Sequence, residues 1–290
     1  MTLTTPITLD GRSLTRAALI AIARDMATVS LHPDALQRVR RAADFLADKV
    51  RCGEPIYGVT TGFGSNADKL LGAHRARDEL PGGNPEARDG SLLEELQHNL
   101  IVTHAVCVGE PFAPEVVRAM LAIRINTLMR GHSGVRVETL QALTAMLNRG
   151  VVPVVPQLGS VGASGDLAPL SHLAIVLLGG GEAFFAGERL PGAEALRRAG
   201  LEPVRLSYKE GLALNNGTAQ MLACATLALD RLQQQLELAD LAAASRSTAS
   251  PPASAAMPTS YWARIARATS CRAATPRRAR AACWKSCSTT

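Results

Sequence analysis

A sudden change of composition at residue 245 confines any packed core to the part of the chain before it. Residues 245–290 contain no Leu, Val, Gly, Phe, Asp or Glu and consist mainly of Ala, Ser, Thr, Arg and Pro. A disordered basic tail accounts for this composition. Translation of a GC-rich gene in a shifted reading frame accounts for it too, and also for the abrupt edge inside a helix. We favour the shifted frame. The preceding residues, in a chain that is 47% hydrophobic, suffice for a packed core.

The charge of the chain divides at the same place. The tail holds eight of the 31 basic residues and none of the 25 acidic ones, so it carries +8 and the remainder −2. A mildly acidic body does not indicate a nucleic-acid partner. No apolar run reaches the roughly 18 residues that span a bilayer, and the start lacks the layout of a secretory signal. No cysteine pair has the spacing of a zinc site. We therefore expect a cytoplasmic protein without membrane, nucleic-acid or metal partners.

Hydrophobic periodicity predicts a mainly α fold. Residues 33–52 place Leu36, Val39, Leu46 and other apolar residues at steps of three and four, between a proline and a glycine that suit helix ends. A capping box at Ser91 predicts a second helix, which runs to His104. Further helices are expected over 114–129, 137–147, 166–178, 192–199 and 218–244. Residues 151–156 are expected to be extended and 182–190 to form a hairpin.

Three segments without a clear period are predicted to be loops, where functional residues tend to lie. They are 54–72, 159–169 and 208–218. We divide the chain into an N-terminal region, 1–110, a helical region, 111–244, and the unrelated tail, 245–290.

The glycine-rich segment GSVGASGDLAP at 159–169 is the most specific motif. Its glycines do not form a phosphate-binding loop, because Asp166 follows Gly165 where that pattern requires a lysine. The dinucleotide-binding spacing fails as well. Ala-Ser-Gly followed by Asp-Leu-Ala-Pro-Leu instead resembles the signature of the aromatic amino acid ammonia-lyases, above all the histidine ammonia-lyases.

That resemblance implies that Ala163-Ser164-Gly165 cyclises without help. The amide nitrogen of Gly165 attacks the carbonyl of Ala163, and loss of water leaves an electrophilic 4-methylidene-imidazol-5-one. Gly165 has no side chain to hinder its nitrogen, and Ser164 supplies the hydroxyl that leaves. A helix that begins after Gly165 directs its positive end at the ring. No metal or external cofactor is implied.

Other residues match the family's site. Tyr57, in IYGVTTGFG, resembles the active-site loop tyrosine, and Gly64 in that loop is a candidate for substrate binding. A phenol with a pKa of about 10 needs positive potential nearby to act as a base. Whether Tyr57 or a tyrosine of the second half is the base stays open. Thr103-His104 resembles the Ser-His pair of histidine-using members, which implies that His104 binds the substrate imidazole.

Asn216, in LALNNGT, resembles the asparagine that binds the ring carbonyl or the substrate amine. Asn215 departs from the aliphatic residue usual before it. His172 is expected to have a packing or hydrogen-bonding role, and His98 to be solvated.

The resemblance covers residues 5–244, about the first half of a family member. It implies a truncated ammonia-lyase fold, with a loop-rich N-terminal region and the start of a long helical bundle through which four subunits assemble. The activity implied is elimination of ammonia from L-histidine to give trans-urocanate. A tyrosine or phenylalanine ammonia-lyase, a 2,3-aminomutase, a non-catalytic fragment and a nucleic-acid binder that uses the basic tail remain alternatives.

Overall fold

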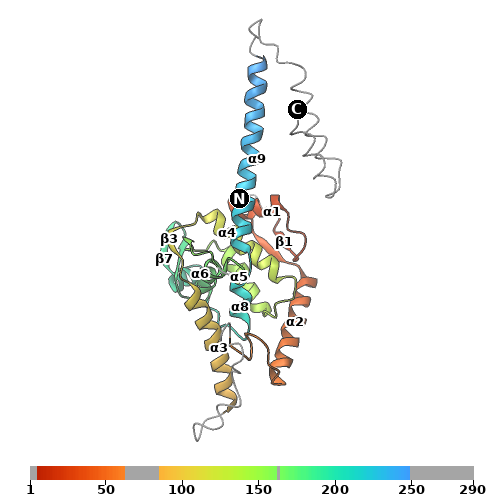
Figure 1. The fold of residues 1–290 in the computed structure, drawn as a ribbon, viewed down its shortest axis with the longest axis vertical. Coiled ribbons are helices and arrows are strands. Elements are labelled where there is room, and N and C mark those ends of the chain that lie inside the picture. Colours follow the sequence, from red (N-terminus) through yellow and green to blue (C-terminus); the bar gives the residue numbers. More distant parts are fainter. Residues whose placement is uncertain (1–4, 63–84, 162–163, 249–290) are drawn as a thin grey trace, which may run out of the picture. The chain divides into compact units, whose positions relative to one another are not determined.

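The computed structural model describes residues 5–62, 85–161 and 164–248, and these are mainly helical, as expected (Figure 1). The chain divides into two units, Met1–Arg231 and Leu232–Thr290. All of the structure discussed below lies in the first unit unless helix α9 (Ala219–Thr248) is named. Most of the basic tail lies outside the described residues, as do Gly64 and Ala163. Helix α9 itself continues past 244, where we placed the domain boundary.

Helix α4 (Pro114–Leu128) is the centre of the core. It begins with a proline at its first turn, where the missing amide hydrogen is not needed. It confirms the helix expected over 114–129, and its Val117, Leu121 and Leu128 are fully buried. Burial also extends around the other faces, because α1 (Arg16–Arg24) and α5 (Val137–Asn148) pack against the same helix.

A buried arginine on α4 joins these three helices. The Arg118 guanidinium donates from Nε to the Ile22 carbonyl of α1 (2.9 Å) and from Nη1 to the Leu147 carbonyl of α5 (2.9 Å). Both acceptors are carbonyls near the C-terminal ends of their helices, where cations are favoured. Burial lowers the pKa of Arg118.

Helix α2 (Pro33–Arg51) confirms the helix expected over 33–52. His32 caps it, because its Nδ1 accepts from the Asp34 amide (3.2 Å). Ala35, Val39 and Leu46 form its buried stripe. Gly53 follows the helix with φ +69°, a conformation that glycine adopts without strain.

Helices α3 (Pro85–His104), α6 (Leu167–Leu177) and α8 (Glu210–Asn215) pack on one another. The prediction that a capping box at Ser91 starts this helix was wrong, because α3 already begins at Pro85 and Ser91 lies in its interior. The prediction of a loop over 208–218 was also wrong in part, since this segment contains α8. That helix starts after Lys209, whose φ is +67°, and it is too short to show a period in the sequence.

Short strands complete the first unit. β1 (Ile7–Leu9) pairs in parallel with β2 (Val29–Leu31), and β3 (Val108–Pro111) pairs antiparallel with β5 (Pro156–Leu158). β6 (Glu182–Phe185) and β7 (Glu188–Pro191) form the expected hairpin, with β4 (Val152–Pro153) on the other edge of β6. Helix α7 (Gly192–Arg198) follows. Among the described helices, none is both long and apolar enough to cross a membrane.

Candidate functional site

The serine of the Ala-Ser-Gly motif has a buried and unsatisfied hydroxyl. Ser164 Oγ makes no hydrogen bond to any described residue. Gly165, next in the chain, has φ +87°, in the left-handed region that favours glycine. A Cβ atom there would lie 3.1 Å from Cε of Met221, so the site is also close-packed. Helix α6 begins two residues later, as predicted.

Asp166 ties this segment to the start of α9. Its side chain is fully buried, and Oδ2 accepts from the amides of Gln220 (2.7 Å) and Met221 (3.0 Å). A carboxylate is favoured at the positive end of a helix. Burial raises the pKa of Asp166, while the two amide hydrogen bonds act in the opposite direction.

The loop that carries Tyr57 is held by its own threonines. Thr60 Oγ1 accepts from the Ile56 amide (2.8 Å) and donates to the Glu54 carbonyl (2.6 Å). Thr60 and Thr61 are buried, whereas Tyr57 is exposed over 54% of its surface. Residues 54–62 are thus a constrained loop, as predicted, and they present the tyrosine at the surface of this chain.

His104 is the last residue of α3, and its ring has a defined orientation. Nδ1 lies 2.8 Å from the Leu100 carbonyl, which can only accept, so Nδ1 carries a hydrogen. Nε2 of the neutral ring is therefore an acceptor. Thr103 Oγ1 donates to the Asn99 carbonyl (2.7 Å) and lies 3.3 Å from the His104 Nδ1.

Asn216 caps the C-terminus of α8 in an extended conformation and is exposed. Asn215 is fully buried instead, and its Nδ2 donates to Ser171 Oγ of α6 (3.2 Å). The departure from an aliphatic residue at 215 thus places a polar contact in the core, between α8 and α6.

Sequence reasoning missed Gln97, which joins the Tyr57 loop to α8. Its side chain is fully buried on α3. Oε1 accepts from the Gly211 amide (3.0 Å), and Nε2 donates to the Gly58 carbonyl at a long 3.5 Å. The signal was available, because Gln97 interrupts the apolar face of α3 three residues before Leu100.

His172 has the hydrogen-bonding role expected of it. Its Nε2 accepts from the Cys107 amide (3.0 Å), which fixes the chain just after α3 to α6. Burial lowers the pKa of His172. His98 is exposed, as expected.

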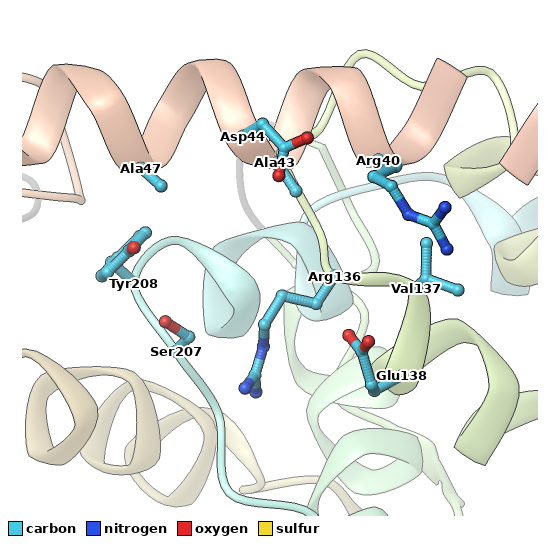
Figure 2. Close-up of a pocket in the computed structure, with 10 residues that line it drawn as sticks. Arg40, Ala43, Asp44, Ala47, Arg136, Val137, Glu138, Ser207 and Tyr208 are labelled. Carbon is cyan, nitrogen blue, oxygen red and sulfur yellow. The ribbon is translucent and has the colours of Figure 1, made fainter. Parts of the chain in front are cut away.

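A surface cavity of about 300 Å³ lies elsewhere (Figure 2). It is bounded by α2, by the first turn of α5 and by Ser207 and Tyr208. Arg136, on its wall, is paired with the buried Glu210 (2.7 Å). None of the predicted site residues lines this cavity. No group of three or more potential metal ligands occurs within the described residues.

Comparison with known proteins gives consistent results. The model of the aromatic amino acid lyase family matches residues 14–270. The histidine ammonia-lyase of Gloeobacter violaceus is 52% identical over 242 residues, which are 83% of this chain and 44% of that protein. The enzyme of the same name from Symbiobacterium thermophilum is 50% identical, over 81% of this chain and 43% of the relative. The chain thus spans less than half the length of these relatives.

Solved structures of similar proteins agree with these sequence matches. Histidine ammonia-lyase from Trypanosoma cruzi superposes with a TM-score of 0.70 at 38% identity, covering 82% of this chain and 42% of that one. Tyrosine aminomutase from Streptomyces globisporus gives 0.68 at 35% identity, covering 79% and 40%.

Proposed function

The chain belongs to the aromatic amino acid lyase family, and on that premise we propose that the full-length protein eliminates ammonia from L-histidine and releases trans-urocanate. The proposal concerns the full-length protein, because this chain matches only 44% of the length of a relative. The relatives named above are histidine ammonia-lyases, and this supports the choice of substrate.

The observation that carries the proposal is the buried Ser164 hydroxyl, which has no hydrogen-bond partner in the part of the chain that the structure describes. Leaving such a group unsatisfied costs about 1–3 kcal/mol, so a functional reason is expected. A hydroxyl that departs as water during self-processing supplies that reason. Ala163, Ser164 and Gly165 thus fit a methylidene-imidazolone. Once formed, this group supplies an electrophilic methylene that activates the amine of the substrate for departure.

His104 supports histidine as the substrate. Because its Nδ1 donates to the Leu100 carbonyl, Nε2 can accept a hydrogen bond from an imidazole N–H. A phenylalanine ring has no such donor, so it would leave Nε2 without a hydrogen-bond partner on the substrate. Asn216 is proposed to bind the substrate amine or the carbonyl of the processed segment, with Gly64 and Thr103 beside the substrate.

Proton removal requires a base, and only one of the two candidates lies in this chain. Tyr57 is one candidate, and a tyrosine of the second half of the protein is the other. We propose that the whole enzyme is a cytoplasmic homotetramer, whose sites combine residues from several chains.

Product analysis tests this function. The purified full-length protein is incubated with L-histidine, L-tyrosine or L-phenylalanine, and urocanate is followed by its ultraviolet absorbance. We expect urocanate from histidine alone, and none from the Ser164→Ala variant, since alanine has no hydroxyl to lose. Ammonia released from tyrosine or phenylalanine and not from histidine would refute the assignment.

A 2,3-aminomutase is the second candidate, because a tyrosine aminomutase is among the similar solved structures. An aminomutase returns the amine to the β-carbon. Chromatography of the same reactions distinguishes the two, since a β-amino acid would accumulate in place of free ammonia.

A further inference from the structure

A serine upstream of the Ala-Ser-Gly motif reaches back to it. Ser160 Oγ donates to the Gly165 carbonyl at 2.6 Å and lies 3.5 Å from Oδ1 of Asp166. The contact joins Ser160 to the last residue of the motif, five positions further along the chain. Ser160 is itself exposed, so its hydroxyl is not committed to any core contact.

The hydrogen bond from Ser160 adds to the hydrogen bonds of Asp166 at the C-terminal end of the motif. Asp166 is held by the amides of Gln220 and Met221, and Ser160 holds the peptide between Gly165 and Asp166. Gly165 is thereby fixed at its carbonyl end, in the left-handed conformation. Ser164 Oγ has no hydrogen-bond partner among the described residues.

Fixation matters because Gly165 supplies the nucleophile. Ring closure forms a bond between its nitrogen and the carbonyl carbon of Ala163. The Ala163 oxygen leaves as water with the amide hydrogens of Ser164 and Gly165. A second water takes the Ser164 hydroxyl with its α-hydrogen. No oxidant is needed. A weak amide nucleophile depends on being held in place, since correct positioning supplies much of the rate of such a step.

We propose that Ser160 is a positioning residue for self-processing: its hydrogen bond to the Gly165 carbonyl holds the backbone of that glycine for ring closure. This rests on the proposed function, because it presumes that the motif is processed.

Two measurements on the purified full-length protein test the proposal. Intact mass follows the loss of two water molecules with time after synthesis. Hydrogen exchange at the amides of residues 166–168 reports the anchoring, and these amides are present whether or not the motif is processed. The variants are Ser160→Ala, Ser160→Thr, which keeps the hydroxyl at an exposed position, and the control Ser30→Ala. Ser30 has an exposed hydroxyl 3.1 Å from Thr8 Oγ1, on the separate strand β2.

We expect Ser160→Ala to lose mass about three- to tenfold more slowly, the factor that one hydrogen bond is worth. Its amides at residues 166–168 should exchange faster by a similar factor. Ser160→Thr should restore both, and Ser30→Ala should change neither. Processing at the parent rate in Ser160→Ala would overturn the proposal. If the full-length parent shows no mass loss, the proposed function fails. Exchange then decides: an unchanged rate in Ser160→Ala overturns the role of Ser160 as well.

Discussion

Backbone groups, rather than opposite charges, form the hydrogen bonds to the buried side chains of Asp166, His172 and Arg124. Asp166 accepts from two amides, and His172 accepts from the Cys107 amide. Arg124 of α4 donates to the Ala213 carbonyl at the end of α8, and burial lowers its pKa to about 10. That value still leaves the guanidinium charged at neutral pH, where it complements the negative end of the helix.

The buried imidazole of His172 makes stability depend on pH. Its folded pKa is lowered from the ordinary 6.5 by burial. As the pH falls below 6.5, the unfolded chain binds a proton that the folded chain does not, so folding weakens until the folded pKa is reached. His172→Gln keeps an acceptor for the Cys107 amide but cannot titrate.

We therefore expect the melting temperature of the parent to fall more steeply than that of His172→Gln between about pH 7 and about pH 5. Calorimetry over that range measures both curves. Parallel curves would show that His172 does not contribute to the acid sensitivity.

The packing of helices α3, α6 and α8 on one another links the segments of the candidate site. Gln97 links α3 to the Tyr57 loop and to α8. A Cβ atom at Gly211 would lie 2.9 Å from the Gln97 carbonyl oxygen, so the two helices can approach only because this residue is glycine. Asn215 then joins α8 to Ser171 of α6.

Replacing Gln97 by methionine keeps the volume and removes both hydrogen bonds. The Gly211 amide is then buried without an acceptor, which costs about 1–3 kcal/mol. Urea denaturation should show this loss in the free energy of unfolding. Gln157→Met is the matched control, because Gln157 is exposed and its side chain donates to the Pro111 carbonyl (3.1 Å) at the surface. Equal effects of the two substitutions would contradict the role given to Gln97.

Helices with local signals could be predicted from the sequence. Contacts between residues that are far apart in the chain could not. Prolines at 33 and 114 begin their helices as expected. Helix α8 was taken for a loop, because it is held by tertiary contacts such as those of Glu210 with Arg136 and Thr139. A short helix of this kind carries no periodicity to detect.

The candidate site divides in the same way. Ser164 and Gly165 were identified by a motif, which is local. The anchoring of Asp166 could not be, because its partners lie more than fifty residues further along the chain. The side-chain roles of Tyr57, Gly64 and Asn216 remain predictions.

In the whole molecule, the second unit presents an apolar surface. Leu232, Leu236, Leu238 and Leu241 of α9 are each more than half exposed. Leu232 and Leu236 are four residues apart and share a face of the helix. Exposed apolar faces of this kind usually mark association surfaces, which agrees with the proposed assembly through a helical bundle.

Substituting these leucines should weaken self-association. In the double variant Leu232→Gln/Leu236→Gln, we expect the association constant to fall by at least about tenfold, since each buried leucine contributes about 1.5–3 kcal/mol. Sedimentation velocity over a concentration series measures it. Gln235→Ala, on the same helix, is the control. A double variant that associates like its parent would exclude this face from the interface.

The contact between Asp166 and the start of α9 also sets an order of events during synthesis. When the ribosome has completed Gly165, the amides that hold Asp166 do not yet exist, because they belong to residues 54 and 55 positions downstream of it. The motif therefore emerges into solution with one of its two restraints missing. If the motif is processed as proposed, we therefore expect its maturation to be timed by translation, because the electrophile forms efficiently only after enough of the chain has followed to fold around it.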